Sequence, residues 1–224
     1  MTNARAECLK RVAGRILGLS PGHPVRVAVD GRTASGKSTL ATELAQPLEA
    51  SGRAVIRTSI DAFHRPAAER HRRGRFSAEG YYRDARDLSA AIDLLLRPLG
   101  AGGNRRYATA SFDLDSDKPV EAELQIADAD SVLLFDGTFL QRPELAGCFD
   151  FAIFVDVPAT VARVRGVARD SAMTGDIAAA EALYDRRYAA AFDLYLSEVD
   201  PTASADVLFD NCDFESPGVS FGSG

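Results

Sequence analysis

The sequence predicts an α/β fold: a three-layer sandwich whose central, mostly parallel sheet of five strands has helices on both faces and a small helical lid. Two observations support this prediction. Five short apolar runs alternate with stretches of helical spacing, as in successive βαβ units. The first run is followed at once by a glycine-rich loop that opens a helix. With 224 residues, 46% of them hydrophobic, the chain suits one domain over 1–224.

The glycine-rich loop reads Gly31-Arg-Thr-Ala-Ser-Gly36-Lys37-Ser38, the G-x-x-x-x-G-K-[ST] pattern of a phosphate-binding loop (P-loop). Gly31 and Gly36 permit backbone conformations that point several N–H groups at a polyphosphate, and the following helix adds its positive dipole end. Lys37 then reaches the β- and γ-phosphates, and the Ser38 hydroxyl ligates Mg²⁺. A glycine turn that binds nothing is the alternative, but the flanking strand and helix favour a P-loop NTPase sandwich. The other loop residues expected around the nucleotide are Thr33, Ala34, Ser35 and Thr39.

Hydrophobic spacing and helix breakers predict the remaining elements in order. Strands are expected at 25–29, 54–60, 131–135, 151–155 and 207–209, each a short apolar run. Helices are expected at 4–18, from 37 onward, at 88–99, at 158–170 and at 177–198. Residues 105–117 alternate weakly, like a hairpin, and the polar tail from about 215 is expected to fray.

Two carboxylates follow predicted strands, Asp61 after the second and Asp136 after the third. Because parallel strands end at the same edge of a sheet, both should face the P-loop. An acidic residue after an apolar strand, downstream of a P-loop, has the Walker B arrangement, so Asp136 is expected to hold Mg²⁺ with Ser38. A strand-end Asp that only makes a turn is the alternative. Asp61 is placed to accept the proton of an attacking hydroxyl group, a role that separates a kinase from a hydrolase.

Two further segments are expected at the site. Residues 62–87 form an arginine-rich connection too long for an idle loop, so a substrate-binding insertion is expected there. Its arginines (Arg70, Arg72, Arg73 and Arg75) either face solvent or attract an anionic substrate, and Tyr81 and Tyr82 either stack on a substrate ring or anchor the loop. Residues 165–180 join two helices through a polar turn. They predict either a lid whose arginines neutralise a transferring phosphate or an exposed helical hairpin.

Composition excludes several classes of function. The net charge of −6 argues against a nucleic-acid partner. No apolar run reaches the length of a membrane span, so no membrane partner is expected. Cys8, Cys148 and Cys212 are widely spaced and are expected to be reduced thiols. The charged N-terminal stretch lacks a signal-peptide core, so the expected location is cytoplasmic.

Several blocks together resemble the uridine kinase-like and phosphoribulokinase-like branch of the P-loop small-molecule kinases. They extend along nearly the whole chain, at 27–41, 59–65, 81–87, 133–137, 154–170 and 205–211. The most specific are Asp61-Ala-Phe63, after the second strand, and Arg169-Asp170, which closes the lid helix. The resemblance implies phosphorylation of a small-molecule hydroxyl group by ATP or GTP, with Asp61 as base, Lys37 and Arg169 as further catalytic residues, and a nucleoside such as uridine or cytidine as the acceptor.

The same resemblance implies a set of substrate-binding residues: Asp61, His64, Tyr81, Tyr82, Arg83, Asp84 and Arg165. The chain departs from the family at three points. Tyr81 stands where the family has a ribose-binding acid, Gly166 follows Arg165 where paired arginines are usual, and Asp136 replaces a Glu. These departures keep open another small alcohol as the acceptor: pantothenate, nicotinamide riboside or a sugar.

A P-loop regulatory NTPase without a small-molecule acceptor is the alternative of a different class. The chain has no Asn-Lys-x-Asp guanine motif and no transporter signature, which counts against a GTPase switch and an ABC ATPase. A nucleotide-binding module without catalysis is disfavoured by the intact Lys37, Ser38, Asp61 and Asp136.

Overall fold

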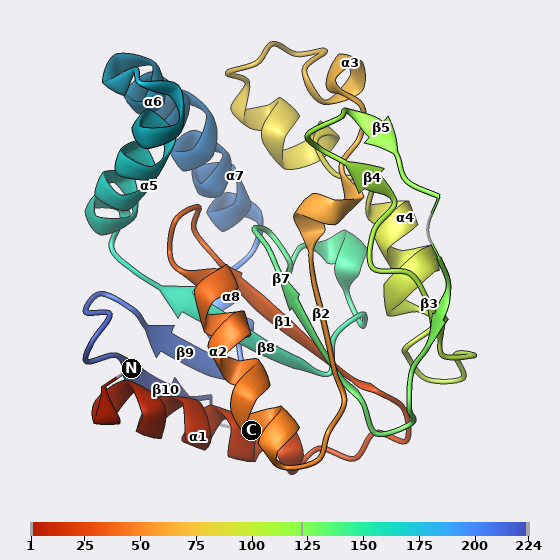
Figure 1. Ribbon diagram of the computed structural model, residues 1–224. Helices are drawn as coiled ribbons and strands as arrows, with labels where there is room; N and C mark the ends of the chain where they lie inside the picture. The colour runs from red at the N-terminus through yellow and green to blue at the C-terminus, as the bar shows by residue number, and fades with distance from the viewer. Residues whose placement is uncertain (1, 122, 223–224) are drawn as a thin grey trace.

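The computed structural model describes residues 2–121 and 123–222 and has a six-stranded sheet between layers of helices (Figure 1). The strand order is β10-β9-β8-β1-β7-β2. The strands are β1 (Val25–Gly31), β2 (Val55–Ser59), β7 (Val132–Asp136), β8 (Phe151–Asp156), β9 (Val207–Asp210) and β10 (Gly218–Phe221). All neighbours pair in parallel except β9 and β10. The α/β sandwich with a mostly parallel sheet is therefore confirmed.

The alternating side chains of β1 divide the core into two layers. Val27 and Val29 face α1 (Asn3–Leu17) and α2 (Lys37–Ala50), while Ala28 faces the opposite layer. That layer contains α4 (Leu88–Ala91), its π-helical continuation η3 (Ile92–Leu96) and, further along, α7 (Ala190–Glu198). Strands buried on both faces are continuously apolar, which is why the predicted runs lacked alternation.

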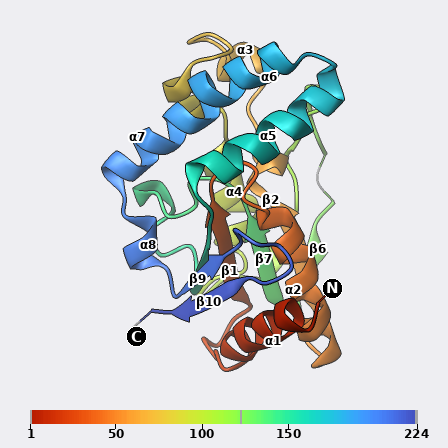
Figure 2. The ribbon, with the colours of Figure 1, turned by 90° about the vertical axis from the view of Figure 1, so that its left-hand side faces the viewer.

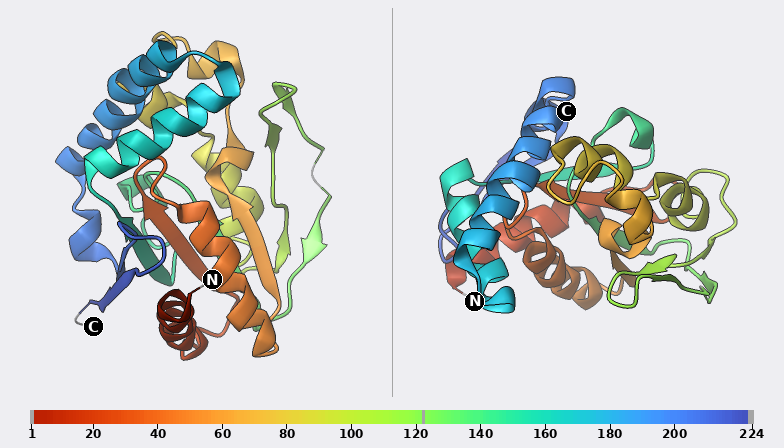
Figure 3. Two further views of the ribbon diagram at one scale, coloured as in Figure 1. Left: turned by 60° about the vertical axis from the view of Figure 1, so that its left-hand side comes forward. Right: turned by 90° about the horizontal axis from the view of Figure 1, so that it is seen from above.

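Two small ladders lie outside β2. β3 (Arg106–Tyr107) pairs with β6 (Gln125–Ile126), and β4 (Phe112–Asp113) pairs with β5 (Lys118–Pro119) (Figure 3). The hairpin expected at 105–117 is thus wrong in its extent, because its first strand pairs with residues beyond it. The tail expected to fray from 215 is also corrected: Gly218–Phe221 forms the sixth strand by antiparallel pairing with β9. An edge strand of this kind depends on a partner distant in sequence, which local polarity does not reveal.

The long connection after β2 is folded. It contains the 3₁₀ turn η1 (Ile60–Phe63), α3 (Ala67–Arg70) and a π-helical turn η2 (Gly80–Asp84). Two helical arms complete the molecule. The first is α5 (Ala159–Thr174), and the second is the continuous run of α6 (Ile177–Leu183), η5 (Tyr184–Ala189) and α7. The two arms lie against each other (Figure 2). The short elements η4 (Pro143–Leu145) and α8 (Pro201–Ser204) are connections.

Candidate active site

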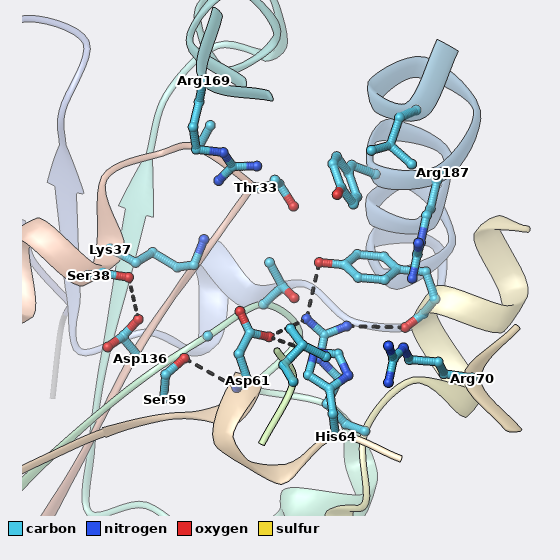
Figure 4. A pocket seen from close by; sticks show the side chains of 18 of the residues that line it. Thr33, Lys37, Ser38, Ser59, Asp61, His64, Arg70, Asp136, Arg169 and Arg187 are labelled. Atoms are coloured by element: carbon cyan, nitrogen blue, oxygen red, sulfur yellow. Dashed lines mark hydrogen bonds and ion pairs between the residues drawn. The ribbon is translucent and has the colours of Figure 1, made fainter. Parts of the chain in front are cut away.

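A cavity of about 690 Å³ lies at the carboxyl edge of the parallel strands. The P-loop, the ends of β2 and β7, the connection 62–87 and the helices α5 and η5 all contribute side chains to it (Figure 4). The sequence-predicted residues that line it are Thr33, Ala34, Gly36, Lys37, Ser38, Thr39, Asp61, His64, Tyr81, Asp136, Arg165 and Arg169. Segments far apart in the chain therefore meet in one space, as the strand-end rule for parallel sheets requires.

The P-loop backbone adopts conformations that are open to glycine and strained for other residues. Gly36 has φ +96°, and a Cβ at this position would lie 2.5 Å from Asn211 Nδ2. A Cβ at Gly31, with φ +148°, would lie 2.5 Å from the Val155 carbonyl oxygen. Only glycine fits at both positions. Gly31 and Ser35, both expected around the nucleotide, are not among the residues that line the cavity, and Ser35 is fully buried.

Lys37 lies at the base of the cavity and donates a hydrogen bond from Nζ to the Arg32 carbonyl at 2.6 Å. Burial lowers the pKa of Lys37, while the carboxylates of Asp30, Asp136 and Asp61 favour its charged form. Among the described residues the Arg32 carbonyl is its one hydrogen-bond partner, and a buried ammonium group with a single neutral partner has strong remaining affinity for an anion. This is the chemistry that a polyphosphate would meet.

Ser38 and Asp136 form a close pair. Ser38 Oγ donates to Asp136 Oδ2 at 2.6 Å, and Arg57 Nη2 approaches Asp136 Oδ1 at 3.4 Å. Asp136 is 3% exposed. A hydroxyl oxygen beside a buried carboxylate is a donor set that suits Mg²⁺, which commonly takes few protein ligands and completes its shell with water and phosphate oxygens. No cluster of three or more His, Cys, Asp or Glu that could hold a metal occurs among the described residues.

Asp61 is held from two sides. Arg86 Nη2 donates to Asp61 Oδ1 at 2.7 Å, and His64 Nε2 lies 3.3 Å from the same oxygen. His64 Nδ1 contacts the Ala85 carbonyl at 2.8 Å, which orients the ring. The position of Asp61 deep in the site would raise its pKa, but the Arg86 and His64 charges outweigh this and hold the pKa of Asp61 well below its usual range. Its side chain is still 57% exposed, so the ionised carboxylate is open to the cavity.

Tyr81 forms the wall beyond Asp61. Its hydroxyl accepts a hydrogen bond from Arg86 Nη2 at 3.1 Å. The guanidinium carbon atoms of Arg86 and Arg187 lie 4.4 and 4.8 Å from the centre of its ring. Burial would raise the pKa of the Tyr81 phenol, but the adjacent Arg86 charge outweighs burial and lowers it. Tyr81 is therefore an electrostatically coupled part of the site and not only an anchor of the connection.

Two arginines of α5, Arg165 and Arg169, line the P-loop side of the cavity. Arg165 donates to the carbonyls of Asn211 and Cys212 at 3.0 and 2.8 Å. Arg169 donates from Nε to Asp170 Oδ1 at 2.7 Å and lies above the loop in Figure 4. The expected lid at 165–180 thus corresponds to the C-terminal half of α5, the turn at Gly175 and the start of α6.

Three residues expected at the substrate do not line the cavity. The Tyr82 hydroxyl donates to Glu198 Oε2 at 2.9 Å, and Arg83 pairs with Glu198. Asp84 accepts hydrogen bonds from Arg72 and Arg73, at 2.8 and 2.7 Å. The π-helical turn η2 turns Tyr81 inward and directs Tyr82, Arg83 and Asp84 elsewhere, a rotation that sequence spacing does not reveal.

Sequence reasoning missed the cavity residues Arg86, Arg187 and Tyr188. It also missed Asp30, which is fully buried immediately before the P-loop. Asp30 accepts hydrogen bonds from the Gly31 and Phe139 amides and from the Tyr195 hydroxyl, at 2.7, 3.0 and 2.6 Å. Burial raises the pKa of Asp30 despite these bonds. The sequence contained one signal for Arg86 and Arg187: both stand in segments, 81–87 and 184–188, where arginines occur beside acidic residues and tyrosines. Arginines on the protein surface would show the same pattern, so the signal did not identify cavity residues.

Comparison with known proteins identifies the family of the chain. The model of the phosphoribulokinase/uridine kinase family matches residues 26–213. Uridine-cytidine kinase B of Dictyostelium discoideum is 33% identical over 154 residues, which are 68% of this chain but only 61% of that protein's length.

Two solved structures share the fold. One is described as a possible uridine kinase from Bacillus stearothermophilus; it has a TM-score of 0.72 and 26% identity, over 92% of this chain and 98% of that one. The D-glycerate 3-kinase from Cryptococcus neoformans has a TM-score of 0.63, over 95% of this chain and 98% of that one. Its 13% identity supports similarity of fold alone. No helix in the described part of the chain is long and apolar enough to cross a membrane.

Proposed function

This chain belongs to the phosphoribulokinase/uridine kinase family of P-loop kinases, and from that premise we propose that it transfers the γ-phosphoryl group of ATP to a hydroxyl group of a small molecule. The observation that carries the proposal is the placement of Asp61. Its ionised carboxylate opens into the same cavity as Lys37 and Ser38, across from the P-loop (Figure 4). A hydrolytic switch does not need a second carboxylate held there by an arginine and a histidine.

In the proposed reaction the P-loop amides and Lys37 bind the β- and γ-phosphates. Ser38 and Asp136 would hold Mg²⁺, which when bound neutralises charge on the phosphates. Arg169, on the lid helix, balances the charge on the moving phosphoryl group.

Asp61 accepts the hydrogen bond of the acceptor hydroxyl and orients its oxygen in line with the γ-phosphorus. Because the pKa of Asp61 is low, we expect it to act first as an orienting group and to take the proton late, as the new P–O bond forms. Arg86 and His64 keep the carboxylate in one position and one charge state.

Uridine and cytidine are the first acceptors to test, since a relative at 33% identity is named for them. Against a nucleoside stands the position of Tyr82, Arg83 and Asp84, which were expected to contact it but make contacts elsewhere. Pantothenate, nicotinamide riboside and sugars remain alternative acceptors. A regulatory NTPase is the second candidate class, since its P-loop and Walker B parts would be the same.

The test is ADP release from Mg·ATP, measured with and without each alcohol of this panel. A kinase releases ADP rapidly only when its acceptor is present. Steady ATP hydrolysis that no alcohol stimulates would favour the regulatory NTPase. GTP in place of ATP decides the nucleotide preference in the same assay.

A further inference from the structure

The cavity carries an excess of positive charge that the nucleotide alone does not account for. Seven Lys or Arg side chains line it, against two carboxylates, among the residues that the structure describes. Lys37, Arg165 and Arg169 lie on the P-loop side, and Arg86 is paired with Asp61. Three further arginines line the cavity, Arg70, Arg75 and Arg187, and Figure 4 shows Arg70 and Arg187 on the far side of Asp61.

Arg187 is the most informative of the three. It is 9% exposed, yet within the described part of the chain its guanidinium group forms no ion pair, and its buried Nε has no hydrogen-bond partner. Its guanidinium carbon lies 4.8 Å from the centre of the Tyr81 ring and 5.9 Å from the centre of the Tyr188 ring. Burial, and then repulsion from Arg86 and Arg70, lowers the pKa of Arg187. A buried, unpaired guanidinium group that faces a cavity is costly unless a ligand completes it.

The neighbours of Arg187 have the same sign. Arg70 donates to Asp117 at 2.6 Å and still lines the cavity, and Arg75 lines it as well. His71, next to Arg70 in the sequence, lines the same cavity, and burial and the charges of Arg187, Arg70 and Arg75 lower its pKa. Figure 4 shows Arg187 and Arg70 on the side of Asp61 opposite to Lys37 and Ser38. The positive region therefore lies at the acceptor end of the site.

We infer that the phosphate acceptor is an anionic alcohol, and that Arg187, with Arg70 and Arg75, binds its carboxylate or phosphate group while its hydroxyl faces Asp61. This rests on the proposed kinase function for the hydroxyl group, but the anion subsite is a property of the pocket itself. A guanidinium fork matches both oxyanions, through paired charge-assisted hydrogen bonds. A neutral nucleoside would leave Arg187 unpaired.

The first test measures binding without turnover. The protein is saturated with Mg²⁺ and a non-hydrolysable ATP analogue, so that the P-loop is occupied, and is titrated by calorimetry. The probes are D-glycerate (carboxylate), ribulose 5-phosphate (phosphate), and glycerol and ribulose as neutral counterparts. We expect one anionic probe to bind while both neutral ones do not, and Arg187→Gln to weaken that binding by about 10–100-fold.

Arg186→Gln is the matched control, because Arg186 is the adjacent, exposed arginine and stacks on Phe76 outside the cavity. It should bind like the parent. Arg187→Lys keeps the charge but loses the fork, and an intermediate affinity is expected. Thermal melting of each variant without ligand distinguishes a structural role of Arg187 from a binding role. A fall in Tm with unchanged probe affinity would assign Arg187 to packing against Tyr81 and overturn the inference.

The second test measures turnover. Stimulation of ADP release by an anionic alcohol, with a KM raised at least about tenfold in Arg187→Gln and an unchanged KM for ATP, supports the inference. Stimulation by uridine at parent-like KM in Arg187→Gln overturns the subsite and leaves the kinase intact. If an anionic probe binds through Arg187 but no alcohol stimulates ADP release, the subsite stands and the kinase function fails. If no anionic probe binds to the nucleotide-loaded parent, the subsite is wrong.

Discussion

Asn211 Nδ2 donates a hydrogen bond to the Ser35 carbonyl at 2.7 Å, so the residue that follows β9 supports the P-loop from behind. The same side chain accepts a hydrogen bond from the fully buried Arg5 at 3.0 Å. A line of polar contacts thus runs from the first helix, through the last parallel strand, to the loop expected to bind phosphate. Gly36 is packed against this amide, which explains why no larger residue fits there.

Asn211→Ala should therefore affect both stability and nucleotide binding. Removing the amide leaves the Ser35 carbonyl without this donor and takes one hydrogen bond from Arg5, which keeps its bonds to Glu43 and to the Phe214 carbonyl. The free energy of unfolding should therefore fall by about 1–3 kcal/mol. The KM for ATP should rise several-fold, because the loop loses its support. Asn3→Ala, at an exposed position at the start of α1, is the control and should change neither quantity appreciably. An Asn211→Ala protein with reduced stability and parent-like KM would show that the contact is structural alone.

Lys37→Ala should abolish ATP-dependent turnover, because no other described side chain on the floor of the P-loop supplies an ammonium group to the phosphates. Thermal melting should show a folded protein. Lys10→Ala, on the exposed side of α1, provides the control. If Lys37→Ala keeps activity within a few-fold of the parent, the assignment of the P-loop is wrong.

Asp61→Asn should lower the turnover rate by at least roughly 10²-fold and leave nucleotide affinity nearly unchanged, because the amide neither takes the proton nor orients the hydroxyl group as an anion does. Asp93→Asn, at an exposed ion pair, is the matched control. A parent-like rate in Asp61→Asn would remove Asp61 from the mechanism.

The pH dependence of turnover follows from the low pKa of Asp61. A lowered pKa means that the carboxylate stays ionised as the pH falls, so titration of Asp61 should not reduce the rate between about pH 7 and pH 5. In Arg86→Gln the main charge that lowers this pKa is gone, so it should rise, and the acid limb of the rate profile should move to higher pH. Profiles that coincide would show that Arg86 does not control the charge of Asp61.

Gly166→Ala tests the contact between α5 and η5. A Cβ at this position would lie 2.4 Å from the Tyr184 ring, whose hydroxyl donates to the P-loop carbonyl of Thr33 at 3.3 Å. We expect a loss of about 1–3 kcal/mol in the free energy of unfolding and a weaker affinity for ATP. Gly14→Ala on α1, with no atom within 4 Å of the new Cβ, should be neutral or slightly stabilising. This packing also explains why Gly166, and not a second arginine, follows Arg165.

Arg169→Ala should lower the turnover rate more than it changes the KM for ATP, if this arginine acts on the moving phosphoryl group. Arg163→Ala is the control on the same helix, because Arg163 pairs with Asp185 and Glu181 outside the cavity. Equal effects of the two substitutions would reduce the role of Arg169 to helix packing.

The sequence by itself determined the sheet strands other than β10, the P-loop and the two strand-end carboxylates. These features depend on local patterns and on one general rule of parallel sheets, that strand ends meet at a common edge. Gly31, Gly36, Lys37 and Ser38 could be predicted as phosphate-binding residues because backbone freedom and residue type favour that chemistry within a few positions of the chain.

The tertiary structure alone decided which side chains complete the site. Arg86 reaches Asp61, and Arg187 turns into the cavity, because the π-helical turns η2 and η5 set the rotation of their helices. The same rotation sends Tyr82 to Glu198, and the edge of β9 converts a polar tail into β10. Such features depend on partners distant in the chain. The burial of these side chains and the charges around them are set only when the layers pack together.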